Sequence, residues 1–131
     1  FVTILLFFSF SDIIEAWSDL VNEDAPASDA WNDDWPDEWL GTQIVVFEFK
    51  EETITVGGLL GNDNVLEASI EAANQQGLEI EIIDSSLGKY VVSIDNIAGE
   101  GWEYTVNGQP GTVSAEFSSL QSDGIVTWKQ L

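Results

Sequence analysis

Alternating apolar and polar residues predict a series of short strands in the second half of the chain. In the clearest case, Trp102, Tyr104 and Val106 alternate with a glutamate and a threonine. This period of two is typical of a half-buried strand, and the following Asn107–Gly108 pair predicts a turn because both residues tolerate positive φ. Alternation also predicts a strand over residues 78–83, and runs of branched and aromatic residues predict strands over 44–49, 53–56, 89–94 and 125–128, with a bend at 57–61 and a loop at 110–122.

A helix is predicted between the second and third of these strands. Over residues 65–75 the apolar positions recur every three or four residues, which is the period of an amphipathic helix. Asn62 or Asp63 is expected to cap its first turn, and Gly77 is a suitable residue for its end. The predicted buried stripe consists of Val65, Leu66, Ser69, Ile70 and Ala73.

The first 22 residues show a different pattern. Residues 1–10 include eight apolar residues and no charge, and from Phe10 to Val21 the apolar positions follow a helical period. The uninterrupted apolar run is too short to span a bilayer. Three alternatives remain: a helix buried among copies of itself in a filament, a remnant of a signal or anchor, and a helix packed on its own domain. The filament alternative predicts a subunit interface formed by Phe1, Val2, Ile4, Leu5, Leu6, Phe7, Phe8, Phe10, Ile13, Ile14 and Trp17.

This N-terminal segment resembles the mature N-terminus of type IV pilins and their archaeal relatives. Those subunits often begin at phenylalanine, as this chain does at Phe1, and continue from an apolar half-helix into an amphipathic half. Leu5 stands where many bacterial pilins carry a glutamate. The resemblance implies a homopolymeric extracellular filament, with the helix in the fibre core and an acidic head domain outside.

Residues 23–42 are predicted to be an acidic, tryptophan-rich linker. Ala25–Pro26 ends the helical pattern, and tryptophan then recurs every fourth residue at Trp31, Trp35 and Trp39. We expect these rings to cover the head domain or a neighbouring subunit, because three indoles are costly to leave in water. Alternatively, the three rings form a platform on which ligands such as sugars stack. Calcium is a possible partner of the acids Asp29, Asp33, Asp34, Asp37 and Glu38.

Composition excludes several classes of function. The chain carries 24 acidic residues against 3 lysines, a net charge of −21, so it lacks the cations that nucleic-acid binding needs. It contains neither histidine nor cysteine, which leaves only oxygen ligands for a metal and no base for a nucleophilic triad. No cofactor is predicted, and we expect the protein not to be an enzyme.

Four motifs in residues 43–131 resemble the transcobalamin C-terminal-like domain family. They are Val65–Ala68, Asp84–Val91, Gly101–Gly108 and Asp123–Trp128; the last runs from Gly124 directly into isoleucine, where the family usually has an aspartate. The resemblance implies an α+β fold: a small β-grasp-like domain with one helix packed on a mostly antiparallel sheet. It also implies a secreted or cell-surface protein. A cobalamin role is not expected, because the helical barrel that holds that ligand would not fit in this chain.

These observations define three segments, 1–22, 23–42 and 43–131, and two hypotheses of function. The first is the filament subunit, and the alternative is a secreted or cell-surface module for adhesion or small-ligand binding with a residual signal or anchor. A pocket lined by Tyr90, Trp102 and Tyr104 would favour the second hypothesis. If these rings serve the core instead, Trp102 and Trp128 are expected to face each other across the sheet.

Overall fold

The computed structural model describes residues 30–131. The predicted N-terminal helix over residues 1–22, together with the whole predicted filament interface from Phe1 to Trp17, lies outside the described residues.

The predicted α+β fold is wrong in its balance of helix and strand. Residues 30–131 are mostly β, with seven strands and one α-helix. Two segments expected to be a bend and a loop contribute residues to strands: residues 57–59 extend a strand, and Pro110 pairs with Thr105 as part of a short one. The elements are η2 (Asp37–Trp39), β2 (Gln43–Glu48), β3 (Thr53–Leu59), α1 (Val65–Gln76), β4 (Ile80–Ser85), β5 (Gly88–Ile94), β6 (Trp102–Val106), β7 (Gln109–Pro110), η3 (Ala115–Phe117) and β8 (Ile125–Gln130).

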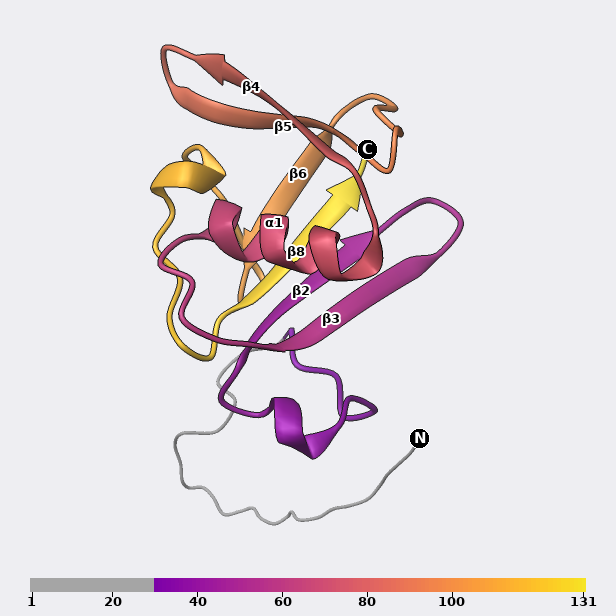
Figure 1. Ribbon diagram of the computed structural model, residues 1–131, viewed down its shortest axis with the longest axis vertical. Helices are drawn as coiled ribbons and strands as arrows, with labels where there is room; N and C mark the ends of the chain where they lie inside the picture. Colours follow the sequence, from indigo (N-terminus) through magenta and orange to yellow (C-terminus); the bar gives the residue numbers. More distant parts are fainter. Residues whose placement is uncertain (1–29) are drawn as a thin grey trace.

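Five strands form one sheet in the order β3-β2-β8-β6-β7, and β4 and β5 form a separate two-stranded ribbon (Figure 1). The β2–β8 pair is parallel, and the other pairs are antiparallel. The register differs from the expected aromatic pairing. Trp128 lies opposite Tyr104, whereas Trp102 lies opposite Gln130.

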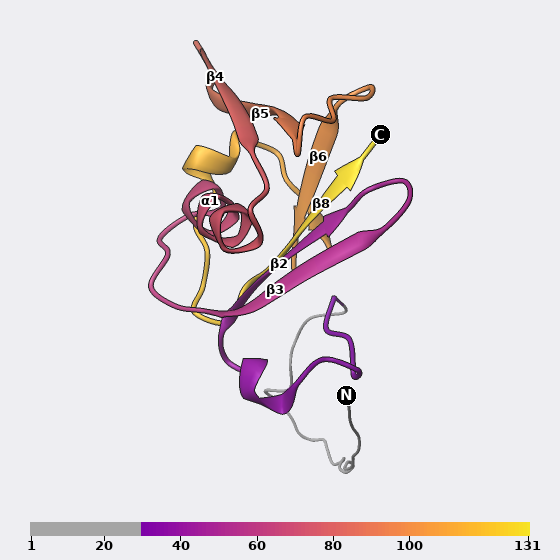
Figure 2. The same ribbon diagram turned by 45° about the vertical axis from the view of Figure 1, so that its right-hand side comes forward.

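Helix α1 covers one face of this sheet, and the main core lies between them (Figures 1 and 2). Val45 and Phe47 of β2 point into this core and are fully buried. Their neighbours Ile44 and Val46 point to the opposite face, where they are also buried. A continuous apolar run is expected of a strand covered on both sides.

The tryptophan-rich arm, residues 30–42, covers that opposite face (Figure 2). Trp31, Trp35 and Trp39 pack on the small cluster of Ile44, Val46 and Ile125. The rings of Trp31 and Trp35 are 5.1 Å apart and nearly perpendicular, at 89°. The indoles therefore cover the head domain, as one interpretation predicted. Because Trp31 meets Trp35 edge to face and Trp39 is tilted by 54° from Trp35, the three rings do not form a flat stacking platform.

The N-cap of α1 is Asn64, not Asn62 or Asp63. Its side chain accepts a hydrogen bond from the backbone N–H of Glu67 at 2.9 Å. We expect Asn64→Ala to lower the free energy of unfolding by about 1 kcal/mol, because a helix donor loses its acceptor. Urea unfolding followed by circular dichroism measures the change. Asn74→Ala, on the exposed side of the same helix, is the control and should be neutral or slightly stabilising; equal losses in the two variants would contradict the capping role.

Candidate functional site

The three aromatic residues predicted to form a ligand face surround one hollow of about 400 Å³, which we call the aromatic hollow. Tyr90 comes from β5, and Trp102 and Tyr104 come from β6. Trp128 of β8 also lines the hollow, and the segment 110–115 forms a wall. The site therefore lies where the β4–β5 ribbon passes over the end of the sheet that carries β6 (Figure 1).

Tyr104 is tied into the wall of the hollow. Its hydroxyl donates a hydrogen bond to the carbonyl oxygen of Val113 at 2.5 Å. Gly111 lies directly against its ring, and a Cβ at Gly111 would be only 2.2 Å from Cζ of Tyr104. The ring thus contributes a surface to the hollow, while its hydroxyl holds the 110–115 segment in place.

Trp102 is also fixed by contacts within the domain. Its indole N–H donates to the carbonyl oxygen of Ile97 at 2.7 Å. Its ring meets Phe49 edge to face, with the centroids 5.2 Å apart. Trp102 can therefore offer a ligand its apolar ring, but its donor is already used.

Tyr90 differs from the other two aromatic residues. Its side chain is 40% exposed, and its hydroxyl has no hydrogen-bond partner among residues 30–131. Of the three predicted residues, it is thus the one with a free polar group at the hollow.

The neighbouring Lys89 places a positive charge at the rim. Its ammonium lies 2.6 Å from a carboxylate oxygen of Asp84, and this hydrogen bond raises the pKa of Lys89 above its ordinary value. The backbone of Lys89 is anchored to η3, since its carbonyl accepts from the Ser114 hydroxyl at 2.6 Å and its N–H donates to Glu116 at 3.3 Å. Both charged side chains of the ion pair are exposed, so the pair adds little stability.

The sequence did not indicate the 110–115 wall or the anchoring role of Ser114. These residues were expected to form an unspecified loop, and only Pro110–Gly111 offered a local turn signal. The contact of Gly111 with Tyr104 depends on tertiary folding, and no pattern within the loop encodes it.

The chemistry of the aromatic hollow suits binding better than reaction. Its lining offers aromatic rings, the hydroxyls of Tyr90, Thr105 and Thr112, the carboxylate of Glu103 and a lysine that is already paired. Between residues 30 and 131, no group of three or more histidine, cysteine, aspartate or glutamate side chains is arranged to hold a metal. No helix in that range is long and apolar enough to cross a membrane.

The fold and the hollow together define a small, mostly β domain with one covering helix. Residues 62–131 match the model of a family described as "Domain of unknown function (DUF4430)". Because the match covers more than half of the chain, the protein belongs to this family. A search of curated proteins found no match.

Two solved structures share the fold. A candidate metal-binding protein from Ruminococcus gnavus ATCC 29149 is 12% identical with a TM-score of 0.55; the match covers 66% of this chain and 92% of that one. Haptocorrin in complex with Cbi is 20% identical with a TM-score of 0.53, over 69% of this chain. The chain spans only 25% of the length of haptocorrin.

The match to haptocorrin and the family match agree with the predicted transcobalamin C-terminal-like resemblance. None of these comparisons supports the pilin resemblance, so the filament remains a prediction about residues outside the described range.

Proposed function

We propose that this protein is a small-ligand-binding module of a secreted or cell-surface protein and that it has no enzymatic activity. The observation that carries the proposal is the aromatic hollow, which is lined by aromatic rings from three strands and includes Tyr90, whose hydroxyl has no partner among residues 30–131. The structural neighbours support it in a general way, because one is a candidate metal-binding protein and the other was solved with a bound small molecule.

The ligand that best suits the aromatic hollow is flat, apolar, and neutral or cationic. Aromatic rings stack on planar ligands and attract cations through their faces. The net charge of −21 disfavours an anion, and the one lysine at the rim is neutralised by Asp84. A hydrogen bond to Tyr90 would then fix the orientation of the ligand.

We test this proposal with three probes that share one ring: 2-naphthylmethylammonium, 2-naphthylmethanol and 2-naphthoate. Isothermal titration calorimetry of the full chain should detect the first two and should detect the anion at least tenfold more weakly. Tyr90→Ala should weaken binding about tenfold, which corresponds to about 1.4 kcal/mol of lost stacking and hydrogen bonding.

Ile83→Ala is the matched control, because Ile83 pairs with Tyr90 across the ribbon and is 50% exposed but does not line the hollow. It should change the affinity less than twofold. If none of the three probes binds, or if the two variants weaken binding equally, the aromatic hollow is not the ligand site.

A further inference from the structure

The outer edge of β4 has no neighbouring strand. β4 pairs only with β5, and the two form a ribbon that is separate from the main sheet (Figure 1). Its register shifts between Glu81 and Ile82, so each half of the ribbon has its own pairing. Hydrogen-bonded pairs alternate along an antiparallel ladder. In the first half, the N–H of Asp95 donates to the carbonyl oxygen of Glu79 at 2.7 Å, so the backbone of Ile80 points away from β5.

The second half of the ribbon leaves the same edge free. The backbone N–H and carbonyl of Lys89 are bonded outside the ladder, to Glu116 and Ser114. Those of its partner Asp84 therefore also point away from β5, and alternation places those of Ile82 at the same edge. Among residues 30–131, no group outside the ribbon bonds to this edge. It thus presents a row of free backbone donors and acceptors from Ile80, Ile82 and Asp84.

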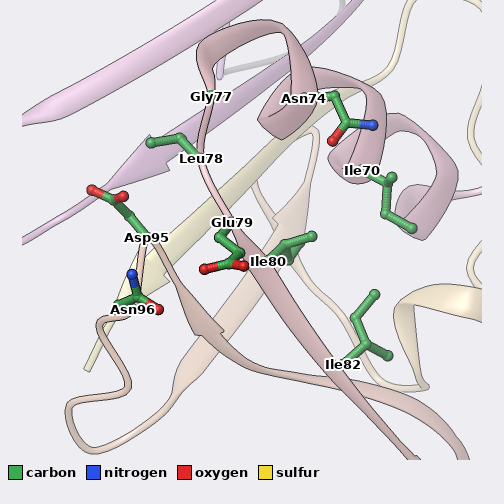
Figure 3. A pocket seen from close by; sticks show the side chains of 9 residues that line it. All are labelled: Ile70, Asn74, Gly77, Leu78, Glu79, Ile80, Ile82, Asp95 and Asn96. Carbon is green, nitrogen blue, oxygen red and sulfur yellow. The ribbon is translucent and has the colours of Figure 1, made fainter.

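An open groove of about 670 Å³ lies between β4 and the second half of α1, and we call it the β4 groove (Figure 3). Figure 3 shows the side chains of Ile80 and Ile82 pointing toward α1, on the side of β4 opposite to β5. Ile70 lines the groove from the helix, and Leu78 lines it from the segment that joins α1 to β4. These four side chains are partly buried and pack against the main core. The free edge therefore borders an apolar floor.

An added strand would use both the edge and the floor. When an extended peptide joins a sheet edge, main-chain hydrogen bonds provide affinity, and contacts with alternate side chains provide specificity. Because side chains alternate between the two faces of a strand, every second residue of such a peptide would lie beside Ile80 and Ile82. A compact apolar molecule could occupy the floor but would leave the row of backbone groups unpaired.

The charges around this edge favour a cationic strand. Glu79, Glu81 and Asp84 are exposed, and Asp84 alone is paired, with Lys89. No residue that lines the groove is basic, and the last turn of α1, whose end carries a partial negative charge, contains no basic residue. A second copy of this chain fits poorly, because two molecules with a net charge of −21 repel each other.

We propose that the β4 groove binds a basic, extended segment of a partner protein, which adds to β4 as an antiparallel strand. Its alternate apolar residues would lie on Ile70, Ile80 and Ile82. Its lysine or arginine residues would lie on the other face, beside Glu79 and Glu81. The β4 groove shares no lining residue with the aromatic hollow, so this site does not depend on the function proposed there.

The probe is an acetylated and amidated peptide in which three valines alternate with four lysines. It is titrated into the uniformly ¹⁵N-labelled full chain, and amide shifts and hydrogen exchange are followed by NMR. Binding should shift the amides of Ile80 and Ile82 and slow their exchange, because both N–H groups gain an acceptor. The same peptide with glutamate in place of lysine should bind at least tenfold more weakly.

Two N-methylated isomers of the peptide test the backbone pairing. In the antiparallel arrangement, the residues opposite Ile80 and Ile82 are valines, and their N–H groups face β4. Methylating the three valine amides should therefore weaken binding at least tenfold, whereas methylating three lysine amides, which face away, should weaken it less than threefold. The isomers have equal mass and charge. Equal affinities, or tighter binding of the valine-methylated isomer, would overturn the proposal.

Two charge-matched variants test the position of the site. Ile82→Lys places a cation on the floor and should weaken binding of the lysine peptide at least tenfold. Ile83→Lys adds the same charge at a half-exposed position of β4 that does not line the groove, and it should weaken binding less than threefold. Circular dichroism checks that both variants fold; if Ile82→Lys does not, the methylated isomers decide with the unchanged protein. Equal weakening in two folded variants, shifts confined to the aromatic hollow, or a dimer whose β4 amides are already protected would overturn the proposal.

Discussion

Replacing Trp128 with alanine should lower the free energy of unfolding by about 3–5 kcal/mol. The side chain is only 3% exposed and lies in the main core between the sheet and α1. Its indole N–H donates to the hydroxyl of Ser69 on α1 at 2.7 Å, and its ring lies 5.2 Å from that of Tyr104. One side chain therefore links the helix, the central strand β8 and the aromatic hollow, and its removal leaves a cavity among all three.

Urea unfolding of the full chain, followed by circular dichroism, measures this loss. The buffer should contain about 0.5 M salt, so that repulsion among the acidic residues is screened. Trp128→Phe keeps an aromatic ring but loses the donor, and it should cost about 1–2 kcal/mol. If Trp128→Ala costs less than Trp128→Phe, or if both are neutral, Trp128 does not link these elements.

A double-mutant cycle with Ser69→Ala isolates the hydrogen bond. Ser69 also donates to the carbonyl oxygen of Val65 at 2.7 Å, so its hydroxyl keeps a partner when the indole is removed. We therefore expect a coupling of about 1 kcal/mol between Trp128→Phe and Ser69→Ala, in the range of a single buried hydrogen bond. A coupling of zero would show that ring packing, and not the hydrogen bond, positions α1.

The positions of the strands could be predicted from the sequence because each strand has its own local pattern. Trp102, Tyr104 and Val106 point to one face whichever strand lies beside them, so alternation alone identified β6. The run of branched and aromatic residues from Ile44 to Phe49 likewise indicated a strand. The sequence of this strand could not show what covers each of its faces. A helix covers one face, and three indoles cover the other.

Register and capping could not be predicted, because both depend on distant residues. Alternation places Trp102 and Tyr104 on one face, but only the pairing of β6 with β8 decides which of them opposes Trp128. The N-cap of α1 was expected at Asn62 or Asp63, whereas the structure places it at Asn64. Asn62 is occupied elsewhere, since its side-chain amide donates to Gln43 at 3.1 Å and to Glu71 at 2.8 Å.

The candidate site, too, could be predicted from the sequence only in part. The aromatic residues were identified because they belong to regular strands, and the structure brings them together around one hollow. The wall formed by residues 110–115 was not foreseen, because the contact of Gly111 with the ring of Tyr104 depends on tertiary folding.

Gly57→Ala should destabilise the protein by about 2 kcal/mol, although alanine normally stabilises a strand relative to glycine. The indole of Trp39 lies flat against this glycine, and an added Cβ would be 2.1 Å from Cδ2 of the ring. Gly57 does not have positive φ, so the backbone itself tolerates alanine. The cost arises because the ring must leave Gly57, which exposes part of the apolar cluster of Ile44, Val46 and Ile125.

The variant Trp39→Ala decides whether this explanation holds. Alone it should cost about 2–3 kcal/mol, because a large ring no longer covers the sheet. In its background, Gly57→Ala meets no ring and should instead stabilise the protein by about 0.5–1 kcal/mol, through the lower entropy of the unfolded chain. This reversal of sign cannot arise from strand propensity, which is the same in both backgrounds. If Gly57→Ala has the same effect with and without Trp39, the contact does not hold the arm, and the outer face of the sheet must be covered in another way.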